Sequence, residues 1–417
     1  MMKYLLLSTA VLLSDTRTTR PVQGWGSEGH EIVANIAYQH LSSKAQSIIQ
    51  DILQLNDDDD NDNKNSQSPL AKIANWADEI RSHEEYKWTA RMHYVDVRDD
   101  IVSGGCHPLD DEKKKEGCVF DYKRDCGDDV CAVGAIVNFT NILSSYYHPQ
   151  HNDEDDDDEQ SQDGGGLRGG QAAQQQQMIK KDDVFTNMRQ TSLKFVTHIV
   201  GDVHQPLHVS RTSDVGGNTI TVKLAASARK QQNDNDDDNE NDLSYSYPTV
   251  DRNGQPLLLL KEDDDNQQLS HHHSHNLHSV WDTTIIEHAI TKFYDGSQSS
   301  FQASIVQDLP NYLSSITSSS SLCMDGSDVT CVSTWANESW DYALDYAYAN
   351  VDGTEIESGV VIGDEYLDRR MEVVKKCLGL GGLRLANVLE MALNVEEKEE
   401  EKEEIVLSPL VRGALSS

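Results

Sequence analysis

Histidine and aspartate residues recur at helical spacing in two segments of the chain. His198 and Asp202 are four residues apart in THIVGD, and His278 and Asp282 are four apart in LHSVWD. Residues four apart are neighbours on a helix surface, so each pair would share one face. A carboxylate in an apolar helix is costly unless it is paired or binds a cation. Imidazole and carboxylate are zinc ligands, so these pairs, with His208 nearby, predict a metal site.

The segments that must position these residues are predicted to be helices. Apolar residues recur with helical period in 28–41, 70–80, 130–143, 184–203, 277–290, 335–349 and 365–393. Strand signals are few: the segment 217–224 alternates after a Gly-Gly turn, and 256–260 is its expected partner. We therefore expect an all-α fold, a mainly helical single domain with a small β-hairpin.

Acidic residues dominate the composition. The 417 residues include 35 Lys and Arg against 71 Asp and Glu, which gives a net charge of −36 and excludes a nucleic-acid binder with a broad basic face. Most of this acid lies in runs within low-complexity sequence, which buries too little apolar surface to offset the entropy of ordering. We expect inserts at 56–68, 149–183, 225–275 and 316–330 and an acidic tail at 395–417. A single domain over 25–394 remains.

The first residues resemble a secretory signal. Lys3 precedes an apolar stretch over 4–13 that is too short to span a membrane. We predict a signal peptide over 1–24 with cleavage after Gly24. A short propeptide is an alternative, because charged residues lie between the apolar stretch and Gly24.

Seven cysteines in an exported chain suggest disulfides. One small loop could be closed by Cys126 and Cys131, and another by Cys323 and Cys331. Three cysteines then remain, with one thiol left over: Cys106, Cys118 and Cys377. Sequons for N-glycosylation begin at Asn138 and Asn337, in agreement with the secretory route.

Other histidines have simpler interpretations. His204 follows Asp202 by two residues and so points off its helix face, which favours a core histidine that supports the site over a ligand. The histidine tract over 271–275 ends a low-complexity insert, so a solvated tract is favoured over a metal site. The sequence contains no nucleophile elbow, P-loop or dinucleotide-binding glycine pattern.

Several motifs together resemble the plant and fungal type I nucleases. They are WGSEGHEIVANIA from Trp25, NWADEIR from Asn75, MHYVDV from Met92, THIVGDVHQPLHVS from Thr197 and NLHSVWDT from Asn276. The motifs occur in the family's order and span nearly the whole predicted domain. The resemblance implies a zinc-dependent, single-strand-specific endonuclease with 3′-nucleotidase activity. Its substrates would be single-stranded DNA, RNA and 3′-nucleotides.

Carried over residue by residue, the resemblance implies three zinc ions. The first would be held by Asp78, His93, His198 and Asp202, and the second by His208, His278 and Asp282. The third would be held by His30, by Asp202 as a bridging carboxylate, and by the backbone amine and carbonyl of Trp25. An amine ligand must be a free, uncharged terminus, so this set independently favours cleavage directly before Trp25.

The resemblance also implies the chemistry around the metals. A metal-bound hydroxide would attack phosphorus and give 5′-phosphate products, with Asp78 and Arg81 as catalytic residues and Arg81 stabilising the phosphorane charge. Tyr94 and Asp96 would bind a base by stacking and hydrogen bonding. Cys118 would pair with Cys377. The enzyme would be a monomer, without a stable protein partner or membrane association, and either secreted or sent to a lytic vacuole.

Two alternatives come from other classes of function. Bacterial zinc phospholipase C resembles this family in fold and ligand spacing, but it has Glu where this chain has Asp282 and lacks the WADEIR pattern. A non-catalytic acidic protein could instead bind divalent ions through the acidic inserts.

Overall fold

The computed structural model describes residues 25–55, 67–101, 105–108, 117–145, 170–225, 275–316 and 323–393. These residues form a mainly helical domain, which confirms the predicted fold class. The longer helices are α1 Ser27–His40, α2 Ser43–Leu53, α6 Ala132–Ser145, α7 Gly170–Val203, α10 Ile285–Phe293, α11 Gln298–Ser314, α12 Val329–Tyr342 and α13 Asp364–Leu393. Shorter helical segments are η2 Ala71–Ile73, α3 Trp76–Ile80, η3 Glu84–His93, α5 Tyr122–Asp125, η4 Gly127–Asp129, η5 Pro206–His208, α9 Leu277–Ser279, η6 Val280–Thr284 and η7 Ala343–Ala347. Among the described helices, none is long and apolar enough to cross a membrane.

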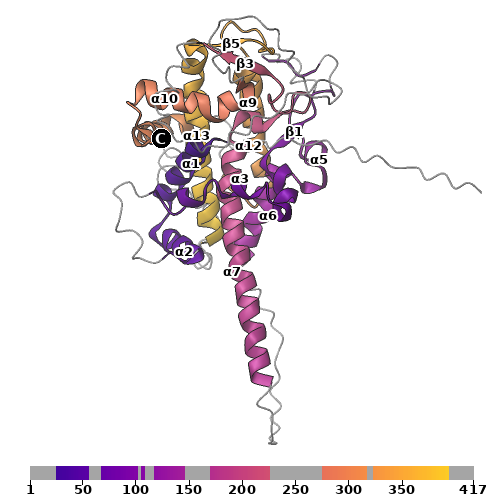
Figure 1. Cartoon of the computed structure of the whole chain (residues 1–417), viewed down its shortest axis with the longest axis vertical. Helices are drawn as coiled ribbons and strands as arrows, with labels where there is room; N and C mark the ends of the chain where they lie inside the picture. Colours follow the sequence, from indigo (N-terminus) through magenta and orange to yellow (C-terminus); the bar gives the residue numbers. More distant parts are fainter. Residues whose placement is uncertain are drawn as a thin grey trace, which may run out of the picture.

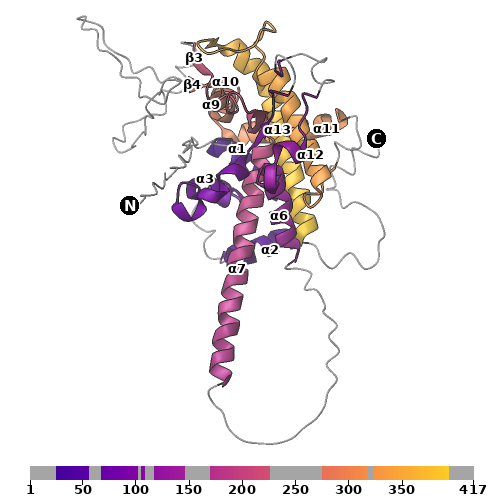
Figure 2. The same cartoon turned by 90° about the vertical axis from the view of Figure 1, so that its right-hand side faces the viewer.

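The long helix α13 lies at the centre of the packing. Its buried residues contact α1, α6, α7, α10 and α11, and Figures 1 and 2 show α7 running beside it and continuing beyond the other helices. Gly382 permits the close approach of α1, because a Cβ there would lie 2.5 Å from Ile36 Cγ2. The apolar periods of α1 and α13 therefore meet in one core.

Short strands join segments that are distant in sequence. β1 (Val95–Val97) pairs in parallel with β2 (Val209–Arg211). The predicted strand after the Gly-Gly turn is confirmed as β3 (Thr221–Leu224), but its observed partners were not predicted. It pairs antiparallel with β4 (His275–Asn276) and parallel with β5 (Val361–Ile362). The expected partner at 256–260 lies outside the described residues.

Several predicted boundaries and elements are corrected. Helix α7 begins at Gly170, inside the insert expected at 149–183. The expected helix over 70–80 is divided into η2 and α3. Helices α2 and α11 were not predicted; α11 is rich in serine and contains Pro310, which obscures its apolar period. Tertiary packing of Phe301, Ile305 and Leu309 nevertheless holds this helix against the core.

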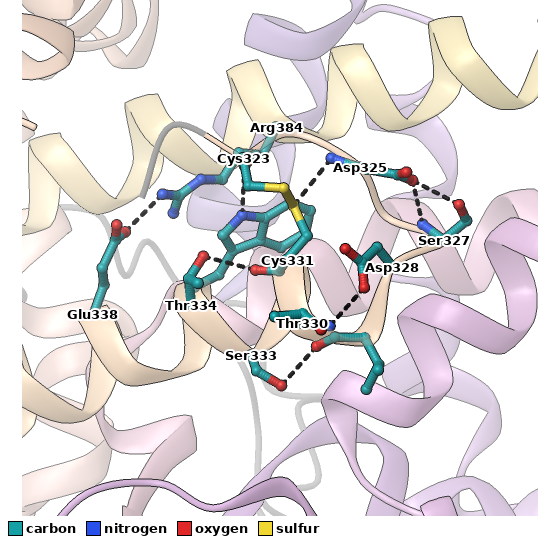
Figure 3. The surroundings of a disulfide bond; sticks show 12 residues. Cys323, Asp325, Ser327, Asp328, Thr330, Cys331, Ser333, Thr334, Glu338 and Arg384 are labelled. Carbon is teal, nitrogen blue, oxygen red and sulfur yellow. Dashed lines mark hydrogen bonds and ion pairs between the residues drawn. A yellow bond between two sulfur atoms is a disulfide. The ribbon is translucent and has the colours of Figure 1, made fainter. Parts of the chain in front are cut away.

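The end of the insert expected at 316–330 belongs to the folded domain. A disulfide joins Cys323 to Cys331 with Cα atoms 5.4 Å apart, and the indole of Trp335 donates a 2.9 Å hydrogen bond to Cys323 O. Asp328 caps α12 by accepting a 2.8 Å hydrogen bond from Thr330 N. Figure 3 shows the bridge and this cap at the start of α12. The polar residues that suggested a loop are thus capping residues.

The disulfide expected between Cys118 and Cys377 is wrong. Cys118 is joined to Cys106, with Cα atoms 5.7 Å apart, whereas Cys377 is a buried thiol. Cys106 is only 12 residues before Cys118 in the sequence. Closing so short a loop costs less chain entropy than joining Cys118 to the distant Cys377. The remaining described bridge joins Cys126 and Cys131.

The two predicted glycosylation sites differ in their surroundings. Asn138 is exposed on α6. The Asn337 amide on α12 is half-buried and donates a 3.0 Å hydrogen bond to Ser333 O. Glycosylation at either asparagine stays a prediction.

Candidate metal centre

The structure brings the predicted metal ligands together in three groups. In each group one ligand atom from every residue lies within 4.8 Å of the others. The groups are His30, Asp78 and His198; His93, His198 and Asp202; and His208, His278 and Asp282. These residues are spread over positions 30 to 282 of the chain, so only the completed fold forms the centre.

Helix α7 supplies the middle of the centre. His198 and Asp202 lie one turn apart on its buried face, with His198 Nε2 3.2 Å from Asp202 Oδ2. Asp78 comes from α3, and its Oδ1 is 3.5 Å from His198 Nε2. His93 at the end of η3 completes the group, with Nδ1 3.0 Å from Asp202 Oδ2. Helical spacing thus produces the shared face that the sequence predicts for His198 and Asp202.

The second His–Asp pair lies where helix geometry changes. His278 is in α9 and Asp282 in the π-helical η6, with Nε2 3.5 Å from Oδ2. Single π-helical turns are frequent at functional sites. Asp282 also accepts a 2.5 Å hydrogen bond from the buried amide of Gln205. Sequence analysis missed Gln205, although its position directly before Pro206 and close to His208 is a signal.

Backbone carbonyls fix the orientation of three histidines. The Nδ1 atoms of His198, His208 and His278 donate to Ala74 O, His93 O and Gly216 O, at 2.6, 2.5 and 2.6 Å. A carbonyl can only accept, so each Nδ1 carries a proton, and each Nε2 is the atom left to ligate a metal with its lone pair. This pattern is typical of metal-binding histidines.

Buried atoms of the centre lack hydrogen-bond partners within the part of the chain that the structure describes. They are both ring nitrogens of His30, His93 Nε2, Asp78 Oδ1 and Asp202 Oδ1. Leaving such atoms unsatisfied costs about 1–3 kcal/mol each. Coordination to cations would satisfy nitrogen lone pairs and carboxylate oxygens together, so the residues fit a metal centre.

The charges of the centre favour cations. Burial lowers the pKa of His198, but Asp202 and Asp78 outweigh burial and raise it to about 10. Burial raises the pKa of Asp202, but His198 and His208 hold it well below its usual range. Burial, with the charges of Asp78 and Asp202, keeps the pKa of Asp282 well above its usual range. Bound metal ions would relieve this repulsion among the three carboxylates.

Trp25 lies against the centre. Its side chain is 1% exposed, and the next residue, Gly26, donates a 2.9 Å backbone hydrogen bond to Asp282 O. The His30 ring stacks on His198 with ring centroids 3.9 Å apart. Gly201 leaves room for both side chains, since a Cβ there would lie 2.8 Å from His30 Nδ1 and 3.8 Å from Trp25 Cδ1. The backbone of Trp25 is thus placed next to the centre.

The predicted catalytic and base-binding residues border the metal ligands. Arg81 is 8% exposed, and its Nη1 is 3.3 Å from Asp78 Oδ1. Tyr94 and Asp96 are half-buried after η3. Burial raises the pKa of Asp96 to about 6, and burial together with Asp96 raises the pKa of Tyr94. The Arg81 charge acts to lower the pKa of both Tyr94 and Asp282. It therefore acts on a base-binding residue and on a residue of the metal centre.

His204 is a buried histidine outside the three groups. Its Nδ1 donates to Val200 O at 2.7 Å, and Arg384 Nη1 donates to its Nε2 at 2.8 Å. Burial, then Arg384, holds the pKa of His204 well below its usual range. A neutral histidine engaged on both sides cannot ligate a metal, in agreement with its interpretation from sequence. Of the histidine tract, His275 is in β4 and 271–273 lie outside the described residues.

The helical fold holds a buried His–Asp centre whose residues fit metal ions, and comparison with known proteins gives the family of the chain. A profile described as S1/P1 Nuclease matches residues 25–233 and 264–394. The chain belongs to the S1/P1 nuclease family. This membership supports nuclease activity over the phospholipase C-like alternative.

Individual relatives cover most of the chain. Endonuclease 4 of Arabidopsis thaliana is 27% identical over 380 residues, which is 90% of this chain and 91% of the relative. Nuclease S1 of Aspergillus oryzae is 26% identical over 376 residues, 88% and 91% of the two chains. Nuclease P1 of Penicillium citrinum is 29% identical over 198 residues, about half of each chain (48% and 52%).

Proposed function

We propose that this protein is a zinc-dependent endonuclease that hydrolyses single-stranded DNA and RNA to 5′-phosphate products and also removes phosphate from 3′-nucleotides. The three His–Asp groups carry this proposal, because they bring ligand atoms of suitable type together in a buried centre. The relatives' names support nucleic acid as the substrate.

The ligand sets support three zinc ions. Asp78, His93, His198 and Asp202 would hold one ion, and His208, His278 and Asp282 another. His30, Asp202 and the terminal amine and carbonyl of Trp25 would hold the third. When bound, zinc supplies Lewis acidity and lowers the pKa of water toward about 7.

The protein's own residues would orient the substrate. Arg81 would bind a phosphate oxygen with its guanidinium group and stabilise charge as it develops on phosphorus. Tyr94 would stack on an unpaired base, and ionised Asp96 would accept a hydrogen bond from a base amino group. A duplex cannot offer an unstacked base, which gives the preference for single strands.

The proposal includes processing and export. A signal peptide over 1–24 would be removed directly before Trp25, and the mature monomer would be secreted or delivered to a lytic vacuole. The folded domain would run over 25–394. Deleting residues 56–66 and 226–274 of the acidic segments would leave hydrolysis intact, whereas a protein that acts only by sequestering ions would lose its function.

One experiment tests this function. Mature protein is sequenced from its N-terminus, its zinc is measured, and hydrolysis is assayed on single-stranded DNA, duplex DNA, RNA and phosphatidylcholine. We expect Trp25 at the start, about three zinc ions, and EDTA-sensitive cleavage of the single-stranded substrates. Activity on phosphatidylcholine alone would refute the proposal.

A matched pair of variants tests the centre itself. Asp202→Asn removes the carboxylate shared among the ligands. Asp368→Asn removes a carboxylate that contacts His288 at 2.8 Å between α10 and α13. We expect the first variant to lose zinc and activity and the second to retain both. Equal zinc content and activity in both variants would exclude the centre as the catalytic site.

A further inference from the structure

An exposed row of side chains leads away from the base-binding residues along η3. This segment, Glu84–His93, is a 3₁₀ helix. Residues three apart in a 3₁₀ helix lie directly in line, with about 6 Å between them along the axis. Trp88 and Arg91 are therefore in line on η3, and Tyr94 directly follows the helix with an extended backbone. An indole and a guanidinium group thus share one side of η3, and the phenol ring of Tyr94 comes next along the chain.

The outer members of this row are accessible. Trp88 is 58% exposed, and its indole nitrogen donates a 2.9 Å hydrogen bond to Glu85 O. A tryptophan held in place but not covered is ready to stack on a flat ligand. Arg91 is exposed and makes no hydrogen bond or ion pair with any residue that the structure describes.

Arg91 also lies near the base-binding pair. Burial raises the pKa of Asp96, and the Arg91 charge acts in the opposite direction. The same charge lowers the pKa of Tyr94 against the larger effect of burial. The guanidinium group is thus close enough to act on both residues, yet it is paired with neither.

Proteins bind single-stranded nucleic acid with surfaces on which aromatic rings alternate with cations. Bases stack on aromatic side chains without regard to sequence, and cations contact the phosphates between them. We propose that Trp88 and Arg91 form a second nucleotide subsite, in which Trp88 stacks on a base and Arg91 binds the phosphate that joins this base to the one at Tyr94.

The direction of the strand follows from the ends of η3. His93, a residue of the metal centre, is at one end of this segment, and Trp88 lies away from the centre. A nucleotide at Tyr94 with its 3′-phosphate in the centre would extend along the row through its 5′-phosphate. This inference rests on the proposed function and adds a preference for longer strands over mononucleotides.

The test compares substrates of increasing length. Thymidine 3′-phosphate and thymidine tri- and tetranucleotides ending in a 3′-phosphate are incubated with mature protein, and phosphate release is measured. The readout is the ratio of kcat/KM for the trinucleotide to that for the mononucleotide. We expect Trp88→Ala to lower this ratio about tenfold and Trp88→Phe to preserve most of it.

Arg91→Ala should lower the same ratio and also weaken its salt dependence. Each phosphate contact to a single strand contributes about 0.7 to the slope of log affinity against log salt, so the slope should fall by about this amount. Two matched controls remove an exposed aromatic and an exposed arginine elsewhere: Phe293→Ala at the end of α10, 46% exposed, and Arg369→Ala on α13. Both should leave the ratio within about twofold of wild type.

The outcomes separate the two proposals. If wild-type protein releases phosphate but Trp88→Ala and Arg91→Ala keep its length ratio, the second subsite is refuted and the proposed function stands. If the controls lower the ratio as strongly as the two variants, the subsite is likewise refuted. If wild-type protein hydrolyses none of the substrates, the proposed function itself fails and the subsite fails with it.

Discussion

Replacing Gly201 with alanine should disable one metal position while the helix around it remains intact. Gly201 lies in α7 between the proposed ligands His198 and Asp202, and a Cβ there would lie 2.8 Å from His30 Nδ1. Ordinary contacts begin at 3.4 Å, so the imidazole must move by at least about 0.6 Å, whereas metal–ligand distances tolerate about 0.2 Å. His30 has little room to yield, because its ring is buried and stacks on His198 at 3.9 Å.

Helix propensity, in contrast to the clash with His30, favours the alanine variant. Alanine in a helix interior is favoured over glycine by about 1 kcal/mol, so Gly201→Ala should not unfold α7. We expect the affinity of the zinc position at His30 to fall by about 10–100-fold, as for lost support around other metal ligands. Phosphate release from 3′-nucleotides should fall with it.

The assay is zinc content after dialysis against graded chelator, with thermal unfolding as a check on the fold. The matched control is Gly127→Ala, because a Cβ at Gly127 meets nothing within 4 Å in the described residues. We expect the Gly201 variant to retain about one zinc ion fewer than the control. A Gly201 variant with the zinc content and activity of wild type would show that His30 is not a ligand.

Three further predictions concern Arg81, Asp96 and the pairing of the cysteines. Arg81→Ala should lower kcat about 10²–10³-fold with little change in zinc content; loss of zinc would show that Arg81 only supports the fold. Because the pKa of Asp96 is about 6, base binding through the ionised carboxylate should weaken as pH falls through 6, and KM for 3′-nucleotides should rise there. Asp96→Asn should abolish this inflection, and an unchanged inflection would assign it to another group. Cys118→Ala removes a disulfide and should lower the free energy of unfolding by about 3 kcal/mol, measured in denaturant. Cys377→Ala should leave every disulfide intact; loss of a disulfide in this variant would contradict the observed pairing.

The part of the site that depends on local spacing could be predicted from sequence. His198 and Asp202 share a face because helical period fixes their relation, and the two are found 3.2 Å apart. The apolar period likewise predicted α1, α7 and α13. At these positions the local pattern and the tertiary packing favour the same structure.

The parts that depend on distant contacts could not be predicted in this way. The partners of β3 come from residues more than 50 positions away, at β4 and β5. Cys106 rather than Cys377 bonds Cys118, and Cys377 is a buried thiol in α13; no local pattern in the sequence distinguishes these pairings. Gln205 supports Asp282 across the centre, and no period in the sequence marks that contact. Each of these features arises only when separate helices meet.

The same long-range assembly would couple bound metal ions to folding. The proposed ligands come from α1, α3, η3, α7, η5, α9 and η6, so an unfolded chain cannot present them together. A ligand that binds only the folded state, at 100 times its dissociation constant, stabilises that state by about 2.7 kcal/mol per site. Chelation of zinc should therefore lower the unfolding temperature by many degrees, and added zinc should restore it. Asp368→Asn should show the full shift, and Asp202→Asn a much smaller one. An unfolding temperature that does not respond to chelator would mean that the three groups are structural clusters that bind no metal.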